Sequence, residues 1–112
     1  MAGHPYLVVV DADAFIEFES LRGREERKAT FNALDKLRQL GPNLVPPHAS
    51  KLKGEPDLME LRPRQGKSQV RPIYARIADG EYVVPAFAIA ADKADFEDAV
   101  KNARVRSVRY RA

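Results

Sequence analysis

Three β-rich segments follow one another in the second half of the chain, with only short turns between them. They are predicted to be strands over residues 58–62, 69–77 and 82–89. Residues 65–67 (Gln-Gly-Lys) mark the first turn, and residues 79–80 (Asp-Gly), a strong hairpin signal, mark the second. Strands joined by such short turns pair antiparallel, so this half of the chain is predicted to form an antiparallel sheet.

The first half of the chain supplies one strand and two helices. Residues 6–10 form an apolar, β-rich run that is predicted to be a strand. Asp11 or Asp13 is expected to cap a short helix that follows this strand. Residues 24–40 give the clearest helix, because leucines and other apolar residues recur there at intervals of three and four. Residues 41–42 (Gly-Pro) end it, and a proline-rich loop is expected up to residue 50.

A final helix is predicted to begin at Asp92 or Asp95 and to end near Arg104. The predicted order is therefore strand, helix, helix, three strands and a helix, in a single domain over all 112 residues. This order favours an α+β fold whose helices cover one face of a mostly antiparallel sheet. Pro72 is expected at a sheet edge or a bulge, because proline cannot donate a hydrogen bond to a strand ladder.

Composition excludes several kinds of site. The chain has no cysteine, which excludes a disulfide scaffold, a zinc–thiolate site and a thiol nucleophile. The chain has only two histidines, His4 and His48, so no metal site is expected. It has neither the glycine-rich motif of phosphate-binding loops nor the HExxH motif of metalloenzymes, so no cofactor is expected either. No apolar run approaches the roughly 20 residues of a bilayer span, and no signal-peptide pattern is evident, so we expect a cytoplasmic protein without a membrane partner.

Basic residues gather around the first predicted hairpin. Lys51 and Lys53 precede its first strand, and Arg62, Arg64 and Arg71 lie on or beside its turn. Facing residues on adjacent strands lie about 5 Å apart, so Arg62 and Arg71 share a surface if the register permits. Several cations in one concavity bind phosphate and stabilise a phosphorane-like transition state. The alternative is that these are ordinary solvated charges.

Other side chains in the same segments admit two interpretations. Glu60 either positions an arginine or forms a routine surface ion pair. Tyr74, Tyr82 and Phe96 are candidates for stacking on nucleic-acid bases, and the alternative for the two strand tyrosines is that they pack in the core. His48 is either an acid–base group or incidental. Residues 101–111 carry five basic residues and no acidic one, which predicts a basic C-terminal tail that either binds a phosphate or a protein partner or only aids solubility.

Four segments in this order resemble the RelE/ParE toxin superfamily, and they are most similar to its phage-derived HigB-like branch. The segments are LDKLRQLGP at 34–42, KLKG at 51–54, DLMELRPR at 57–64 and VRPIY at 70–74, and the similarity extends over about residues 6–104. The resemblance implies a small RelE-like, microbial RNase-like fold. It also implies a toxin of a type II toxin–antitoxin system that cuts mRNA on the ribosome without a metal. The implied partners are that mRNA and a cognate helix-turn-helix antitoxin.

The resemblance also implies roles for individual residues. Arg62 and Arg71 would stabilise the transition state, and Lys53 would be a base or a phosphate clamp. The implied substrate-binding residues are Lys51, Arg64, Tyr74, Lys93 and Phe96.

The chain departs from the family pattern in its C-terminal part. Ala90 and Ala91 stand where HigB-like relatives often carry two lysines, and Phe96 stands where RelE-like relatives have a tyrosine. Phenylalanine can stack on a base but cannot transfer a proton. Two alternatives therefore stay open, a non-catalytic inhibitor of DNA gyrase like those of the ParE branch, and a degenerate phage-derived binding module.

Overall fold

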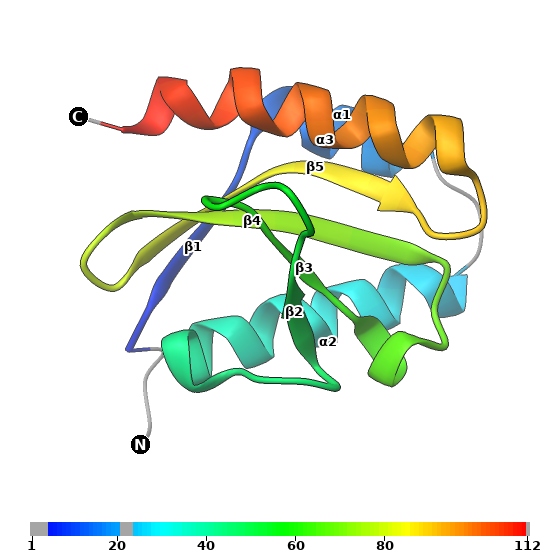
Figure 1. The fold of residues 1–112 in the computed structure, drawn as a ribbon. Coiled ribbons are helices and arrows are strands. Elements are labelled where there is room, and N and C mark those ends of the chain that lie inside the picture. The colour runs from blue at the N-terminus through cyan, green and yellow to red at the C-terminus, as the bar shows by residue number, and fades with distance from the viewer. Residues whose placement is uncertain (1–4, 21–23, 112) are drawn as a thin grey trace.

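The computed structural model of the protein describes residues 5–20 and 24–111 and contains a five-stranded sheet with helices on both sides (Figure 1). The strands are β1 (Leu7–Val10), β2 (Ala49–Lys51), β3 (Met59–Leu61), β4 (Val70–Ala78) and β5 (Glu81–Ile89). Their order is β1-β5-β4-β3-β2, and only the β1–β5 pair is parallel. The predicted α+β class and mostly antiparallel sheet are confirmed. β2 is an additional strand, because the sequence predicts a proline-rich loop up to residue 50 and no strand between residues 10 and 58.

Three helices and three short 3-10 turns complete the fold. The helices are α1 (Ala12–Glu19), α2 (Arg24–Leu40) and α3 (Lys93–Ser107), and the turns are η1 (Gly41–Asn43), η2 (Pro63–Gly66) and η3 (Val108–Tyr110). Asp11 caps α1 and Asp92 caps α3, in each case by accepting hydrogen bonds from backbone N–H groups of the first turn. No helix in the described part of the chain has both the length and the apolar character needed to cross a bilayer.

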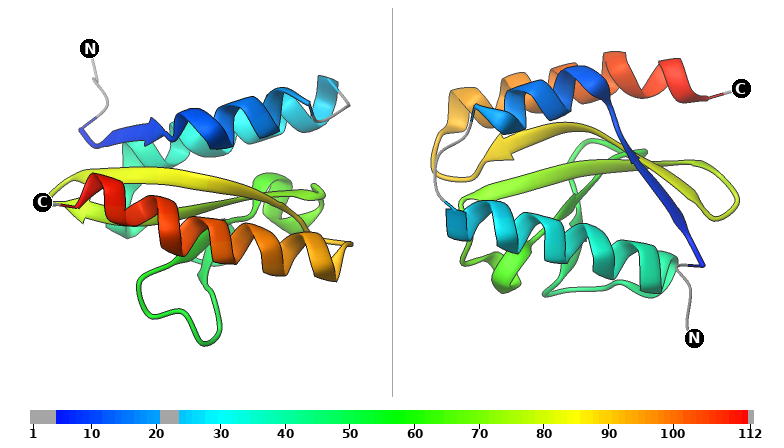
Figure 2. Two further views of the ribbon diagram at one scale, coloured as in Figure 1. Left: turned by 90° about the horizontal axis from the view of Figure 1, so that it is seen from above. Right: turned by 180° about the vertical axis from the view of Figure 1, so that it is seen from behind.

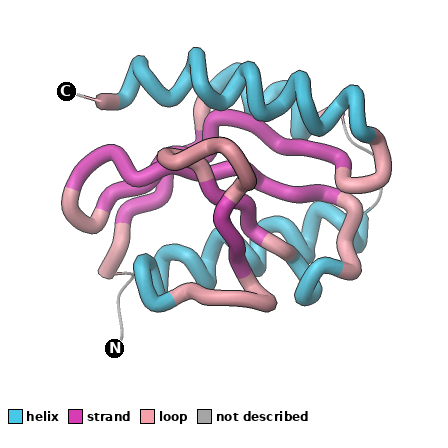
Figure 3. The backbone as a smooth tube through the Cα atoms, viewed as in Figure 1, coloured by secondary structure: helices cyan, strands magenta, loops and turns pink. Residues whose placement is uncertain are grey.

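The helices cover both faces of the sheet, which corrects the prediction that they share one face. α1 and α2 lie on one side and α3 on the other, as the left view of Figure 2 shows, and Figure 3 traces the helices and strands along the backbone. The reason is visible in β4, where Val70 and Tyr74 belong to the core under α2 while Ile73 and Ala75 belong to the core under α3. Because successive side chains of a strand point to opposite faces, a strand that carries buried apolar residues on both faces needs cover on both.

The two strand prolines differ in their surroundings. Ile73 pairs with Ala86 and Ala75 pairs with Val83, so two residues of β5, one of them Pro85, oppose a single residue of β4. Pro85 therefore lies in a β-bulge. Pro72 lies in the regular part of a central strand, where it pairs with Phe87, so it is neither at the sheet edge nor within this bulge.

The last turns of α3 are tied to α1 by side chains. Arg106 donates two hydrogen bonds to the Glu17 carboxylate, at 2.8 and 2.7 Å. Arg109 lies 3.1 Å from an oxygen of Asp13, and the Tyr110 hydroxyl donates to Asp11 at 2.8 Å. Burial would raise the pKa of Asp11, but the hydrogen bonds from Tyr110 and from two backbone N–H groups, with the nearby charge of Arg106, bring this pKa below its usual value.

The basic segment from about residue 101 is therefore not a tail. It continues α3 to Ser107, and four of its arginines pair with carboxylates elsewhere in the fold. Besides the pairs to α1, Arg104 binds Glu55 at 2.6 Å and Arg111 lies 3.8 Å from Asp57. These contacts support the interpretation that the segment holds the fold together.

Candidate phosphate-binding site

Two arginines meet at one buried carboxylate on the α3 side of the sheet. Glu60 of β3 is only 7% exposed, and its Oε1 atom accepts from Arg62 at 3.3 Å and from Arg71 at 3.5 Å. The Ser50 hydroxyl donates to the same oxygen at 3.2 Å. One negative charge thus faces two positive charges, so this arginine pair, Arg62 and Arg71, keeps a net positive charge of about one at a site partly shielded from water. Glu60 is not a routine surface ion pair.

Strand pairing explains why these residues meet. Glu60 pairs with Ser50 of β2 and with Ile73 of β4, so the three side chains lie on one face of the sheet. Arg62 follows Glu60 by two residues and Arg71 precedes Ile73 by two, so both arginines point to that same face at the same end of the hairpin. The predicted shared surface of Arg62 and Arg71 is confirmed.

The chain between the two arginines forms a tight turn, and Arg71 supports it. Arg71 donates to the carbonyl oxygen of Gly66 at 2.9 Å and to that of Ser68 at 3.3 Å, and its side chain is 12% exposed. Arg64 and Gln65 have φ values of 55° and 58°, a left-handed conformation that costs roughly 1–2 kcal/mol per non-glycine residue. The turn is thus held in a strained shape by the same arginine that faces Glu60.

Gly66 and α2 complete the support of this turn. A Cβ atom at Gly66 would lie 2.6 Å from a terminal nitrogen of Arg62, so glycine leaves the space that this guanidinium occupies. Glu26 of α2 accepts hydrogen bonds from the Ser68 hydroxyl and, at 3.1 Å, from the backbone N–H of Gln69. These contacts link the site to α2. Arg62 has a side chain that is 34% exposed, so its remaining donors are open to a ligand.

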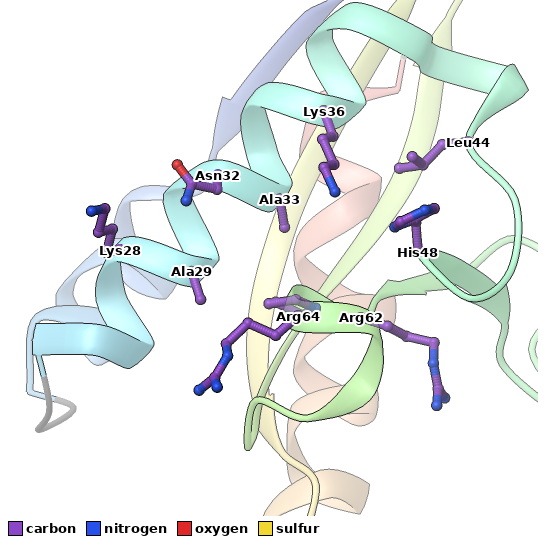
Figure 4. A pocket seen from close by; sticks show the side chains of 10 residues that line it. Lys28, Ala29, Asn32, Ala33, Lys36, Leu44, His48, Arg62 and Arg64 are labelled. Atoms are coloured by element: carbon purple, nitrogen blue, oxygen red, sulfur yellow. The ribbon is translucent and has the colours of Figure 1, made fainter.

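A basic cleft of about 550 Å³ adjoins the arginine pair on the α2 side (Figure 4). Its lining residues are Lys28, Ala29, Asn32, Ala33, Lys36, Leu44, His48, Arg62, Pro63 and Arg64. Figure 4 shows Lys36 of α2 and His48 on two sides of the cleft, with Arg62 and Arg64 flanking η2. Arg62 belongs to both the cleft and the arginine pair, so one connected surface carries all these cations.

The two predicted lysines lie elsewhere. Lys51 pairs with Met59, so its side chain is on the α2 face of the hairpin, opposite to the face of Glu60. Lys53 lies beyond the end of β2, in the turn that leads to β3, and it belongs neither to the hydrogen bonds of Glu60 nor to the lining of the cleft. Neither lysine therefore belongs to the cluster of Arg62 and Arg71 at Glu60, and a contact of these lysines with the substrate stays a prediction. The odd–even alternation of β2 separates Lys51 from the arginines.

The predicted aromatic contacts also differ from the stacking interpretation. Tyr74 is 2% exposed and belongs to the core under α2, where burial first and the neighbouring Tyr82 second raise its pKa to about 12. Phe96 is half-buried against the core under α3, and Lys93 is exposed in the first turn of that helix. Tyr74 therefore offers no face to a ligand, and Phe96 is mainly a core residue.

Two lysines of the cleft were not predicted as site residues. Lys28, Asn32 and Lys36 recur at intervals of four along α2, so they share one side of the helix. This periodicity was available in the sequence, but the position of η2 opposite them was not. In the described part of the chain, no group of three or more His, Cys, Asp or Glu side chains is placed to hold a metal ion.

Comparison with known proteins places the chain in a family. Residues 17–101 match the family model described as Phage derived protein Gp49-like (DUF891). A structure of a mutant E. coli toxin RelE in the free state matches with a TM-score of 0.63 and 24% identity, covering 87% of this chain and 96% of that chain. The archaeal RelE–RelB complex from Pyrococcus horikoshii OT3 matches with a TM-score of 0.55 and 23% identity, covering 77% and 96%.

No curated protein matches the chain significantly. The structural similarities establish the fold, and the family match extends from α1 into α3, across the hairpin that carries the arginine pair. The predicted resemblance to the phage-derived branch of the RelE-like proteins is confirmed. The protein has a RelE-like fold and belongs to the Gp49-like family of phage-derived proteins.

Proposed function

We propose that this protein is the toxin of a type II toxin–antitoxin system and that it inhibits translation by cutting mRNA on the ribosome. The observation that carries the proposal is the arginine pair on Glu60, which combines excess positive charge, partial burial and a surface open at Arg62. The RelE-like fold supports the same activity. The proposed partners are ribosome-bound mRNA and a helix-turn-helix antitoxin, and the proposed compartment is the cytoplasm.

The proposed reaction uses the nucleophile that RNA itself provides. The 2′-oxygen forms a bond to the adjacent phosphorus and gives up its proton to water. The bond from phosphorus to the 5′-oxygen breaks, and that oxygen takes a proton from water, which leaves a cyclic phosphate and a 5′-hydroxyl. Negative charge grows on the non-bridging oxygens in between. Arg62 donates to these oxygens, and Arg71 adds positive charge while it holds the turn in place.

Glu60 has a positioning role in this mechanism. Its single carboxylate holds both guanidinium groups close together, and the net charge of the three groups stays positive. Lys51 and Lys53 lie at the far end of the hairpin, so we assign them to the RNA backbone away from the scissile phosphate, with Lys53 as a phosphate clamp. Lys93 and Phe96 flank the start of α3 and are proposed to contact the substrate beside the arginine pair.

Induced expression with primer extension on cellular mRNA tests the proposal. Wild-type protein should give discrete cleavage sites within coding regions, and the Arg62→Ala/Arg71→Ala variant should give none. The matched control is Arg76→Ala/Arg104→Ala, which removes the same charge at two exposed arginines that each pair with one carboxylate. Intact transcripts with unimpaired translation, or full toxicity of the Arg62→Ala/Arg71→Ala variant, would contradict the proposal.

A second candidate function is non-catalytic inhibition of DNA gyrase. The observation in its favour is that Ala90 and Ala91 offer no charge after β5 and that Phe96 packs against the core, so none of these three side chains can transfer a proton. Supercoiling assays with purified protein separate the two functions. A gyrase poison traps cleaved DNA and leaves mRNA whole, whereas an mRNA endonuclease does the reverse.

A further inference from the structure

We infer that the basic cleft between α2 and η2 binds the phosphodiester backbone of single-stranded RNA beside the scissile phosphate. The inference rests on the proposed function, because it extends the path of the same substrate. It assigns roles to Lys28, Lys36 and Arg64 in RNA binding, and the first two lie outside every predicted set of site residues.

The charge of the cleft is of one sign. Its lining includes four cationic side chains, Lys28, Lys36, Arg62 and Arg64, together with His48, and among the described residues it includes no carboxylate. No ion pair in the described part of the chain involves Lys36 or Arg64. By contrast, the arginines at the end of α3 all face carboxylates. A cleft lined by one sign of charge concentrates counter-ions of the opposite sign, so its ligand is a polyanion.

The spacing of the cations suits a strand rather than a single anion. Lys28 and Lys36 are eight residues apart on one side of α2, which separates their Cα atoms by roughly 12 Å along the helix axis. Asn32 lies between them and can donate to a phosphate or sugar oxygen. Arg64 stands opposite on η2 in a left-handed conformation that keeps its side chain exposed. The cleft therefore contacts several successive phosphates at once.

The lining favours RNA over an acidic protein segment. Protein interfaces are anchored by aromatic or large aliphatic side chains in apolar pockets. Here the apolar lining consists of Ala29, Ala33, Leu44 and Pro63, which are all buried. None of the large hydrophobic residues that are exposed in the described part of the chain lines the cleft. Among the described residues, the lining contains no phenylalanine, tyrosine or tryptophan, and its cations favour contacts to phosphates, so binding is expected to depend little on base sequence.

Arg62 connects the cleft to the proposed chemistry. It lines the cleft, and its guanidinium also meets Glu60 beside Arg71. We therefore place the RNA strand so that it runs from its scissile phosphate at the arginine pair, past Arg62, into the cleft. This continuity predicts that the cleft contributes to substrate affinity rather than to the bond-breaking step.

Salt titration of RNA binding tests the inference. The probe is a fluorescent 12-nucleotide RNA with 2′-O-methyl groups, which cannot be cleaved because its nucleophile is blocked, and binding is followed by anisotropy. Lys28→Gln/Lys36→Gln should weaken binding at low salt at least tenfold. It should also reduce the slope of log K against log salt by about 1.4, or 0.7 per lost phosphate contact. The matched control is Arg76→Gln/Lys101→Gln, which removes the same charge from exposed positions outside the cleft.

The outcomes separate this inference from the proposed function. A slope change confined to the cleft variant supports the inference even if the wild-type protein cuts no mRNA, a result that would contradict only the proposed function. Equal losses in the cleft variant and the control, or no loss in either, would overturn the inference while leaving cleavage at the arginine pair intact. Displacement of the RNA by a 12-residue polyglutamate peptide at equal concentration would also overturn it, since the cleft would then favour an acidic protein.

Discussion

Two clusters in this molecule both combine arginines with carboxylates, but one has more carboxylates than arginines and the other has fewer. At the end of α3, Arg106 and Arg109 face three carboxylates, those of Asp11, Asp13 and Glu17. At the turn after β3, the arginine pair faces the single carboxylate of Glu60. Both clusters lie partly buried, the first between elements at opposite ends of the chain and the second between two strands joined by one turn. The first is saturated with negative charge, whereas the second retains positive charge.

The difference teaches how to separate structural arginines from functional ones. Arg71 and Arg106 have side chains of equal exposure, 12% each, and both donate to backbone carbonyl oxygens as well as to a carboxylate. Burial and hydrogen bonding therefore do not distinguish them. The ratio of carboxylates to guanidinium groups does, because only a cluster with excess positive charge gains energy from an incoming phosphate.

The largest expected effect is on catalysis at the arginine pair. Arg62→Ala should reduce single-turnover cleavage of ribosome-bound mRNA by roughly 30- to 1,000-fold, about 2–4 kcal/mol, by analogy with the loss of one preorganised donor. Arg62→Lys keeps the charge but loses the planar fork, so it should recover part of the loss. An unchanged rate in Arg62→Ala would show that the proposed role of this side chain is wrong.

At the saturated cluster the expected effect is on stability. Asp11 is 1% exposed, and its carboxylate accepts from Tyr110 and from the first turn of α1. Asp11→Ala removes a helix cap and leaves a partly buried hydroxyl without its acceptor, which should lower the free energy of unfolding by about 2–3 kcal/mol in urea titrations. Cleavage by the folded variant should stay within about twofold of wild type. A large loss of activity without a loss of stability would contradict this assignment.

The same carboxylate predicts a pH dependence. Because the pKa of Asp11 is lowered by folding, its contribution to stability is present above the unfolded value of 3.8 and is lost as the pH falls through the lower folded value. The free energy of unfolding of the wild type should therefore fall as the pH decreases below about 4. Asp11→Asn should flatten this part of the curve, and identical curves for both proteins would contradict the prediction.

The smallest effect is expected at the exposed end of the basic segment. Arg104 and Glu55 form a bidentate pair on the surface, where water and salt screen the charges and both side chains lose entropy. Arg104→Gln should therefore change neither the unfolding midpoint nor cleavage measurably. Loss of activity in this variant would indicate that the basic segment contacts the substrate after all.

Much of the fold could be predicted from local signals. Helix α2 begins and ends where periodicity and Gly41 indicate, and the strands β3, β4 and β5 lie within two residues of their predicted bounds. β2 was missed because three residues beside a proline-rich loop carry too weak a pattern. The sequence did not predict that helices cover both faces of the sheet. This arrangement follows only when the apolar residues on both faces of all the strands are considered together, and no single segment shows it.

The site could be predicted only in part. Arg62 and Arg71 follow from adjacent strands joined by a turn, and their shared face depends on a register that the pattern of β3 and β4 specifies. Lys51 lies on the face of the sheet opposite to Glu60 because it belongs to β2, and the sequence did not predict this strand. The basic segment near the C-terminus was predicted to be a tail, although its arginines pair with carboxylates. The sequence does not indicate these pairs, because the carboxylates lie about 50 to 100 positions away in the chain.

The most direct test compares Arg71→Ala with Arg106→Ala in single-turnover cleavage of ribosome-bound mRNA, with the unfolding free energy of each variant measured in parallel. Because the two arginines match in exposure and in the kinds of bonds they make, their structural losses should be similar. We predict that Arg71→Ala loses at least 100-fold in rate while Arg106→Ala stays near wild type when folded. Equal losses of rate in the two variants, or no loss in Arg71→Ala, would contradict the claim that excess positive charge at Glu60 serves the chemistry.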